Sequence, residues 1–441
     1  MTPYIYNCVK KTNEKIKARF CMPGHIGKEI GMEFDTALKY DLTELIGTDN
    51  LNNPSGVILK SLENAKEISG AKSAAFITSG ASIGIKAMLF LAARNKKIIV
   101  DRFSHHSVID GIALSKITPI FTKPRYRENT AIPTPPTKSD IKELILKNKD
   151  VNSVIITTPN YYGIDADLAG IYEVCQQYGK KLLVDNSHGT HYLFLKNPPY
   201  KIAKVCDMWV NSAHKTLPIL TGGAILFSNY IKREELTNAI SLFSTSSPSF
   251  LTLASLDFGL CFCDRNRNKF EKAIENTNRI KEKLTKIGYK VVDSSDKLRL
   301  VVEMENAEKA LKSLYLKGIA IEMADEHNLV LIISPLIQYN ELNLLAKELK
   351  LLYNKRSYVT KTPKDFTVVS KMPVNTAMFS ESEVMSIDTA IGEISAECVT
   401  VYPPSVPIIV PGELLTKEVI GIIKTRAKKS EIRVVKKDNS L

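Results

Sequence analysis

The sequence predicts an α/β fold with a mainly parallel central sheet, and three observations support this prediction. Between about residues 70 and 227, short apolar runs alternate with helix-like stretches, the pattern of repeated βαβ units. The runs are nearly continuous in apolar residues, as expected for strands that helices cover on both faces. Polar motifs follow their ends, where such sheets bind ligands. Strands are expected at 73–77, 97–100, 119–121, 153–157, 181–184, 208–210 and 224–227.

Four parts are expected along the chain, because its texture changes at three places. Residues 1–50 form an N-terminal segment, and 51–287 form the large domain, which closes with a long helical region at 249–286. A small α/β domain is expected at 288–360 and a C-terminal domain at 361–441. Strands of the small domain are expected near 298–304, 319–322 and 329–333.

The composition of the 441 residues narrows the class of protein. No uncharged apolar run reaches the roughly 18 residues of a membrane span, and the N-terminus lacks the plan of a signal peptide, so a cytoplasmic protein is expected. The seven cysteines lack zinc or redox spacing and are expected to be reduced thiols in the core. The net charge of +13 is spread among glutamates and indicates solvated helix faces. Only the group from Lys424 to Lys437 is a basic cluster, and we interpret it as a polar helix end and tail, not as a nucleic-acid contact.

The stretch Asn211-Ser212-Ala213-His214-Lys215-Thr216-Leu217-Pro218 follows an apolar run. A lysine at such a strand end, with Asp185 at another strand end upstream, fits a site for pyridoxal phosphate (PLP). Lys215 would hold the aldehyde of PLP as an imine, and Asp185 would keep the pyridine nitrogen protonated. Taken alone, the pentapeptide around Lys215 could equally be a polar loop with a solvated lysine.

The motifs, in their order, resemble the Orn/Lys/Arg decarboxylase family of fold type I PLP enzymes. The resemblance covers nearly the whole chain and implies an aspartate-aminotransferase-like PLP domain with small α+β C-terminal domains. The length resembles the short form of the family, without the N-terminal wing domain. The motifs that carry the resemblance are Pro23-Gly24-His25, Asp101-Arg102 with His105 and Ser107, Pro159-Asn160-Tyr161-Tyr162-Gly163, the segment from Asp185 to His191, the segment from Ser212 to Pro218, and the proline-rich segment from Tyr402 to Glu413.

The resemblance implies a role for each polar strand end. His105 stacks on the cofactor ring, and His188 reaches a cofactor oxygen or the substrate carboxylate. Lys215, His105, His214 and His188 form the expected catalytic set, in which Lys215 donates a proton and His214 is a possible relay. Backbone N–H groups and hydroxyls between a strand and a helix can cradle the phosphate. The residues expected to bind the phosphate are Ser79, Gly80, Ala81, Ser82, Ser212 and His214.

Thr245 and Ser246 resemble a segment that supplies a phosphate contact to the neighbouring subunit, which implies a homodimer with shared active sites, possibly within a higher oligomer. The same serine-rich segment could instead only cap a helix. No metal, nucleic acid or membrane partner is expected.

The implied reaction is decarboxylation of lysine, arginine or ornithine to a polyamine-type amine and carbon dioxide. The distal cation of such a substrate needs an acidic group, and Glu397, Glu413 and Glu322 are the candidates, with Asp325 as a further one. Each could also be an ordinary surface carboxylate. The alternatives are another fold type I activity, namely an aminotransferase or a carbon–sulfur lyase, or a non-catalytic PLP-binding homologue.

Several positions depart from the family pattern near the substrate side. Asn186 and Ser187 replace the usual Glu-Ala, and Phe103 replaces a usual asparagine. His106 stands where the family usually has a lysine, as does Ile26. Ser405 replaces the glycine of a Pro-Pro-Gly turn. These departures make an altered substrate preference an open alternative.

Overall fold

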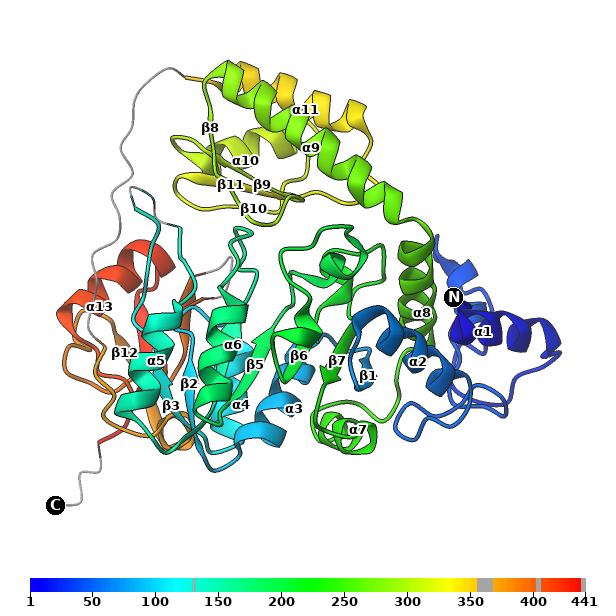
Figure 1. Ribbon diagram of the computed structural model, residues 1–441, viewed down its shortest axis with the longest axis horizontal. Coiled ribbons are helices and arrows are strands. Elements are labelled where there is room, and N and C mark those ends of the chain that lie inside the picture. Colours follow the sequence, from blue (N-terminus) through cyan, green and yellow to red (C-terminus); the bar gives the residue numbers. More distant parts are fainter. Residues whose placement is uncertain (129, 131, 355–367, 402–405, 438–441) are drawn as a thin grey trace. The chain divides into compact units, whose positions relative to one another are not determined.

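A computed structural model describes residues 1–441 except 129, 131, 355–367, 402–405 and 438–441 (Figure 1). The chain divides into two compact units. One comprises 1–88, 184–300 and 331–353, and the other comprises 89–183, 301–330 and 354–441. The predicted division of the chain into four parts remains a prediction.

The central sheet has seven strands in the order β1-β7-β6-β5-β4-β2-β3, and the α/β prediction is confirmed. Its buried apolar runs became strands where they were expected, with bounds that differ by at most two residues. Because these runs alternate with amphipathic stretches, the chain returns through a helix between most strands. The strands are β1 Ser73–Ile77, β2 Lys97–Val100, β3 Thr118–Phe121, β4 Val151–Thr157, β5 Lys181–Asp185, β6 Met208–Asn211 and β7 Ala224–Ser228.

Strand β7 runs antiparallel to both of its neighbours, β1 and β6. Strand β2 is parallel to both β3 and β4. The antiparallel direction of β7 follows from the short connection after β6, which holds the turn η4 Ala213–Lys215 and no crossover helix. The start of β7 therefore lies beside the ends of β1 and β6.

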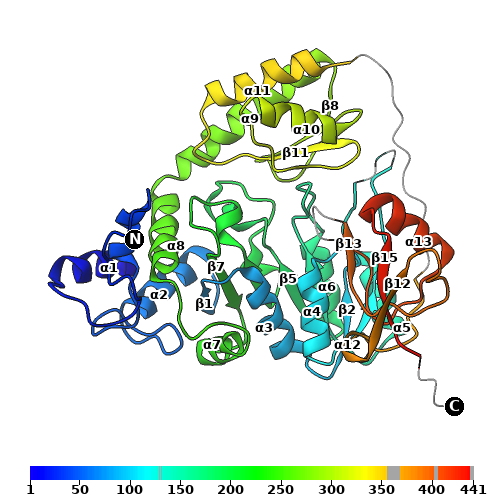
Figure 2. The ribbon, with the colours of Figure 1, turned by 180° about the vertical axis from the view of Figure 1, so that it is seen from behind.

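In the first unit, helices pack around β1 and its neighbours (Figures 1 and 2). Helix α1 lies against α2 and α8, and α7 lies against β1. The predicted helical region at 249–286 is two helices that meet at Asn266. The helices of this unit are α1 Tyr4–Lys15, α2 Val57–Ser69, α7 Arg233–Ser241, α8 Phe250–Arg265, α9 Arg267–Ile287 and α11 Tyr339–Leu352, and its short helical turns are η1 Asp35–Tyr40, η2 Thr190–Phe194, η3 Ile202–Lys204 and η4.

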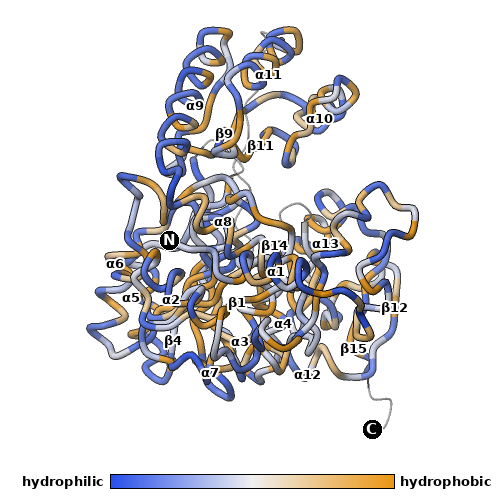
Figure 3. Tube along the Cα trace, turned by 90° about the vertical axis from the view of Figure 1, so that its right-hand side faces the viewer, coloured by the Kyte–Doolittle hydropathy of each residue, from blue (hydrophilic) through white to orange (hydrophobic). Residues whose placement is uncertain are grey.

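Helix α9 shows why these sequences form amphipathic helices. Its buried apolar side chains Phe270, Ala273, Ile280 and Leu284 follow one another at three, seven and four residues, and so share one face of the helix. The other face is hydrophilic, as the alternating colours along α9 in Figure 3 show. Gly288 ends the helix in a left-handed conformation with φ 114°.

In the second unit, α5 and α6 pack together, and α12 packs on α4 (Figure 2). The C-terminal part has its own apolar core, which includes Ile387, Ile409, Leu415 and Val434. Helix α3 Ala81–Ala93 has its first eight residues in the first unit and its last five in this one. The helices of this unit are α4 His106–Leu114, α5 Lys138–Lys147, α6 Leu168–Gln177, α10 Ala307–Leu316, α12 Val374–Phe379 and α13 Lys417–Ile422, which continues into the π-helical turn Ile423–Ala427.

Three smaller sheets complete the described structure. A four-stranded sheet has the order β10-β11-β9-β8, and two two-stranded sheets pair β12 with β15 and β13 with β14. The small-domain strand predicted at 319–322 is wrong in position, because β10 begins at Met323. The bounds are β8 Lys290–Val291, β9 Arg299–Glu303, β10 Met323–Ala324, β11 Asn328–Ile332, β12 Ser382–Ser386, β13 Val399–Val401, β14 Val406–Ile409 and β15 Glu431–Val435.

Several cations of the basic C-terminal cluster form ion pairs, and the cysteines are free thiols. Within the basic C-terminal cluster, Lys424 pairs with Asp388, Lys429 with Glu397 and Lys437 with Glu393. All seven cysteines are free thiols, as predicted, although Cys8, Cys21 and Cys398 are only partly buried and so lie outside the expected core. A search of the described helices finds none with the length and apolarity of a membrane span.

Candidate active site

The lysine turn begins where β6 ends. Ser212, buried at 2% exposure, precedes η4, so that Lys215 stands in a tight turn directly after a buried strand. The Lys215 Nζ lies 3.2 Å from the Nε2 of His188. Since η2 packs against η4, the two turns that follow β5 and β6 bring these side chains together, as the strand-end pattern predicts.

Asp185 ends β5 and is buried, with 2% of its surface exposed. Its Oδ1 accepts hydrogen bonds from the Ser187 N–H, at 3.1 Å, and from the Ser187 hydroxyl, at 2.5 Å. Burial raises the pKa of the Asp185 carboxyl above its ordinary value, while Ser187 and the charge of Lys215 partly offset this rise. A buried carboxylate so placed gains stability from a protonated ring nitrogen beside it.

Gly222, which the sequence reasoning missed, anchors the end of β1 to the start of β7. The Gly80 N–H donates to the Gly222 carbonyl at 2.8 Å. Gly222 has φ +97°, and a Cβ there would lie 2.6 Å from the carbonyl oxygen of Thr78. Only glycine fits this close backbone approach. The Gly-Gly pair before a buried strand could have revealed this position, because such a pair indicates a loop that requires a positive φ.

The predicted phosphate cradle is therefore narrower than expected. The Gly80 N–H is taken by Gly222, and the Ile83 N–H donates to the Gly80 carbonyl at 3.2 Å. The donors left for an anion are therefore the N–H groups of Ser79, Ala81 and Ser82, at the start of α3. Ser82 lies in the first turn of α3 and is partly buried.

His214 lies next to Lys215 in η4. Its Nδ1 lies 3.1 Å from the Gly223 carbonyl oxygen and 3.5 Å from the Ser212 hydroxyl. Burial lowers the pKa of His214, a hydrogen bond to Gly223 partly offsets this, and Lys215 lowers it further. A neutral imidazole beside the lysine amine can accept a proton, as the predicted relay requires.

The surroundings of the lysine turn fit PLP. In the described part of the chain, Asn211 and Thr216 carry buried side-chain polar atoms that have no hydrogen-bond partner. Such atoms are costly to bury unless a ligand engages them. Together with the amine of Lys215, the carboxylate of Asp185 and the N–H groups at the start of α3, these residues match a group that has an aldehyde, a ring nitrogen and a phosphate.

A second histidine, His191, is held by a residue far along the chain that the sequence reasoning also missed. The His191 Nε2 lies 2.9 Å from the Asp296 Oδ1, and both side chains are 1% exposed. Burial raises the pKa of Asp296, but His191, Arg299 and the Leu298 N–H outweigh it, so that the pKa lies below its ordinary value. The pair holds η2, and hence the turn that follows Asp185, in place.

His105 belongs to the second unit, where its contacts are local. It is the N-cap of α4, and its Nδ1 lies 2.8 Å from the Ser107 hydroxyl and accepts the Ser107 N–H at 3.2 Å. Its ring lies 4.1 Å from that of His106, between centroids. These contacts hold the imidazole in one orientation, and its stacking on the cofactor stays a prediction.

The predicted acidic residues of the substrate site differ in their surroundings. Glu413 is buried and pairs with Arg102 through contacts of 2.6 and 3.1 Å, so that its charge is already compensated. Glu397 accepts from Lys429 at 2.8 Å and from the Arg433 N–H. Both carboxylates thus serve structural ion pairs, which does not fit the predicted role of a free substrate carboxylate. Glu322 accepts only the hydroxyl of Tyr161 among the described residues.

Thr245 and Ser246 are exposed in the loop before α8, and Ser249 is the N-cap of that helix. The segment does cap a helix, although the cap follows Pro248, whereas the sequence predicted a cap with proline after it. The contact of Thr245 and Ser246 with a second subunit stays a prediction.

The residues that depart from the family pattern form contacts with nearby side chains. Asn186 donates to the Tyr200 hydroxyl at 2.9 Å, and the Phe103 ring meets that of Tyr126 edge-on at 5.3 Å. Ser187 replaces an apolar neighbour of Asp185 by a hydrogen-bond donor. Ser405 and the first residues of its proline-rich segment lie outside the described residues.

A mainly parallel seven-stranded sheet that sets a lysine turn beside a buried strand-end aspartate defines a fold type I PLP-dependent enzyme. The chain belongs to the Orn/Lys/Arg decarboxylase family: the model of the family's major domain matches residues 2–305, and that of its C-terminal domain matches 355–429. The predicted family, fold class and amino-acid decarboxylase class are confirmed.

Known proteins resemble the chain over most of its length. It is 28% identical to an arginine decarboxylase of Bacillus subtilis over 95% of this chain and 92% of that protein. A lysine decarboxylase of Francisella novicida has the same fold, with a TM-score of 0.85 and 17% identity over 98% of this chain and 81% of that one. A serine palmitoyltransferase of Sphingomonas wittichii shares the fold more loosely, with a TM-score of 0.58 and 16% identity over 80% of this chain and 83% of that one.

Proposed function

We propose that the chain binds PLP through Lys215 and Asp185 and decarboxylates a basic amino acid, with arginine as the first substrate to test. The 3.2 Å approach of the Lys215 amine to His188, beside the buried carboxylate of Asp185, is the observation that carries the proposal. The arginine decarboxylase of Bacillus subtilis supports the choice of arginine. The products would be agmatine and carbon dioxide, which assigns the reaction to polyamine metabolism.

The residues of the chain divide the work. PLP, when bound, supplies an electron sink for the bond that breaks between Cα and the carboxylate. Asp185 holds the ring nitrogen in its protonated form, and Ser187 holds Asp185 in a single orientation. Lys215 returns a proton to Cα, and His188, 3.2 Å from its amine, can exchange a proton with it. His214, the preceding residue of the same turn, is the further candidate for a proton relay.

Glu322 is our candidate for recognition of the distal cation of the substrate. Glu413 and Glu397 are already paired with Arg102 and Lys429, whereas Glu322 accepts the hydroxyl of Tyr161 and pairs with no cation among the described residues. A guanidinium or ammonium would gain most from the carboxylate that has no cation of its own.

A homodimer is part of the proposal. Large apolar side chains are exposed in the N-terminal segment, and such a cluster is typical of a protein interface. Thr245 and Ser246 are exposed as well and would reach the phosphate of a second subunit. Light scattering of the purified protein tests the dimer. The exposed apolar residues are Phe20, Met22, Ile30, Phe34 and Ile46.

Release of labelled carbon dioxide tests the activity. The purified chain, supplied with PLP, is incubated with carboxyl-labelled arginine, lysine and ornithine. Lys215→Ala should lose the visible absorbance of lysine-bound PLP and at least about 10³-fold in rate, because the amine that carries the proton is gone. Lys201→Ala, at an exposed lysine of the same unit, is the matched control. Keto-acid formation without carbon dioxide would instead give the chain the aminotransferase activity.

A further inference from the structure

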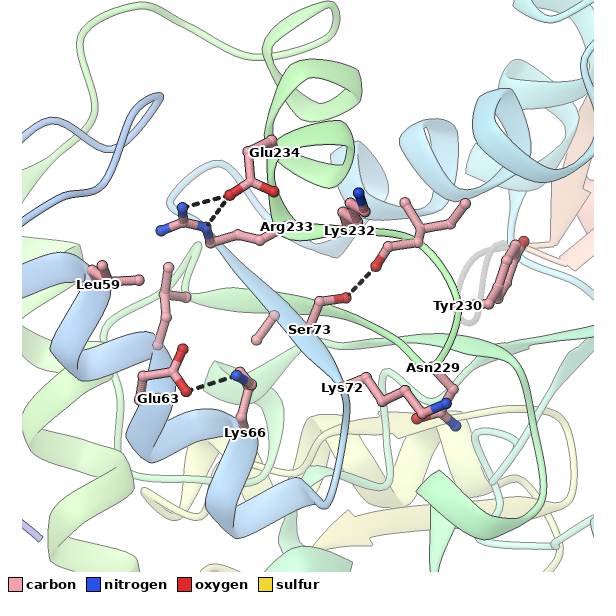
Figure 4. A pocket seen from close by; sticks show the side chains of 13 residues that line it. Leu59, Glu63, Lys66, Lys72, Ser73, Asn229, Tyr230, Lys232, Arg233 and Glu234 are labelled. Atoms are coloured by element: carbon pink, nitrogen blue, oxygen red, sulfur yellow. Dashed lines mark hydrogen bonds and ion pairs between the residues drawn. The ribbon is translucent and has the colours of Figure 1, made fainter.

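A pocket of about 620 Å³ lies at the other end of β1 from the phosphate cradle (Figure 4). It is formed by α2, the start of β1 and the connection from β7 to α7. None of its lining residues belongs to the Lys215 site, so the proposed reaction leaves the pocket without a role. It is lined by Leu59, Leu62, Glu63, Lys66, Lys72, Ser73, Ala74 and 229–234.

The charges around the pocket do not balance. Glu63 pairs with Lys66 at 2.6 Å, and Glu234 pairs with Arg233 at the same distance, so that each carboxylate is used by a neighbouring cation. Lys72 and Lys232 are both exposed, and the described residues give neither ammonium group a hydrogen bond or an ion pair, although the charge of Lys232 also acts on Glu234. Figure 4 shows both ammonium groups without a marked interaction. The lining thus holds four cations, Lys66, Lys72, Lys232 and Arg233, against two carboxylates, Glu63 and Glu234, which leaves a net charge of +2.

The floor of the pocket is rigid and apolar. Leu62 and Ala74 are each 1% exposed, and the Ser73 hydroxyl donates to the Ile231 carbonyl at 2.5 Å. The Ser228 hydroxyl accepts the N–H groups of Tyr230 and Ile231 and so fixes the turn beside Lys232. Because the floor's own polar groups are satisfied, a ligand would gain dispersion contacts there and charge contacts only at the rim.

We propose that this pocket is a second ligand site, which takes an organic phosphate monoester. A dianionic phosphate between Lys72 and Lys232 compensates both charges, and the organic part covers Leu59 and Leu62. The volume lies within the range of small-molecule sites, roughly 300–1,000 Å³, and exceeds what a single phosphate ion fills.

Calorimetric titration of the PLP-loaded protein tests the proposal, with glucose 6-phosphate, AMP, inorganic phosphate and uncharged adenosine as probes. We expect saturable binding of at least one monoester, weaker binding of inorganic phosphate and none of adenosine. The two monoesters distinguish a sugar phosphate from a nucleotide as the source of the phosphate. Absence of saturable binding of both up to about 10 mM, a range typical of weak sites, would overturn the proposal.

Two variants locate the binding. Lys72→Gln combined with Lys232→Gln should weaken binding at least tenfold, whereas Lys286→Gln with Lys290→Gln, an equal charge change at exposed positions outside the pocket, should change it less than twofold. Leu59→Trp fills the pocket without a charge change and should also abolish binding. Affinity that survives both pocket variants would place the monoester elsewhere and refute the site.

Discussion

His191 and Asp296 stand 105 residues apart in the chain, yet their side chains meet at 2.9 Å in a fully buried contact. Arg299 lies 3.6 Å from the same carboxylate, and its guanidinium nitrogens have no other partner among the described residues. One carboxylate therefore compensates two potential cations where water does not reach. The turn that carries Asp185 and His188 depends on this contact, since η2 follows it directly.

Asp296→Asn should lower the free energy of unfolding by about 3 kcal/mol, because Arg299 would keep a buried charge without a counter-charge. Urea denaturation measures the loss, and Asp293→Asn, at a carboxylate 87% exposed in the same loop, should cost less than about 0.5 kcal/mol. Since the pKa of Asp296 is lowered on folding, its contribution exists above its ordinary value of 3.8 and is lost as the pH falls below it. The variant should lack that acid-side loss of stability.

Asp257 should make the stability fall as the pH rises. Its Oδ2 accepts the N–H groups of Ile5 and Tyr6 at 2.8 and 3.1 Å and so caps α1. Burial raises the pKa of Asp257 to about 6, although Ser61 and these N–H groups lower it. A raised pKa contributes stability that is full below about pH 4 and lost as the pH rises through 6, a change of up to about 3 kcal/mol.

Unfolding of Asp257→Asn between pH 4 and 8 checks this, because the amide cannot titrate and the slope should disappear. Asp264→Asn, on the same helix, should keep the wild-type slope. An unchanged slope in Asp257→Asn would assign the pH dependence to another group.

Glu413→Gln should destabilise the fold by about 3–5 kcal/mol and leave the KM of the surviving enzyme unchanged, since the carboxylate is bound to Arg102, to the Val410 N–H and to no exposed group. Thermal unfolding and steady-state kinetics separate the two effects. Glu397→Gln removes a partly exposed pair and should cost at most about 1 kcal/mol. A raised KM with intact stability in Glu413→Gln would return Glu413 to the substrate site.

Gly222→Ala should weaken PLP binding about tenfold. The added Cβ would lie 2.6 Å from the Thr78 carbonyl oxygen and would force the phosphate-binding loop after β1 away from the start of β7. Absorbance titration of the apoprotein with PLP measures this. Gly318→Ala carries a similar φ penalty, at +77°, with nothing within 4 Å of the new Cβ, and should bind PLP as the wild type does. Equal losses in the two variants would mean that strain alone weakens binding.

The sequence predicted those parts of the molecule that local pattern encodes. Buried apolar runs such as Ala224–Ser228 became strands, and the strand-end rule brought Lys215 and His188 together. The pairing of Arg102 with Glu413 could not be predicted from the sequence pattern, because two charges that are 311 residues apart produce no periodicity. Glu413 was therefore interpreted as a substrate residue, from the family resemblance and the acidic group that a cationic substrate needs. The strand at 319–322 was misplaced because β-branched residues there precede the actual pairing at Met323.

The dipeptide Gly222-Gly223 fixes the distance between the phosphate-binding loop and the lysine turn. The carbonyl of Gly222 holds the Gly80 N–H, and the carbonyl of Gly223 holds the His214 N–H. The loop that faces the phosphate and the turn that carries the lysine are thus clamped to consecutive peptide units, and neither can shift without the other. The backbone therefore sets the distance between the phosphate-binding loop and the Lys215 amine. The site should favour a cofactor whose phosphate and aldehyde are separated by that distance.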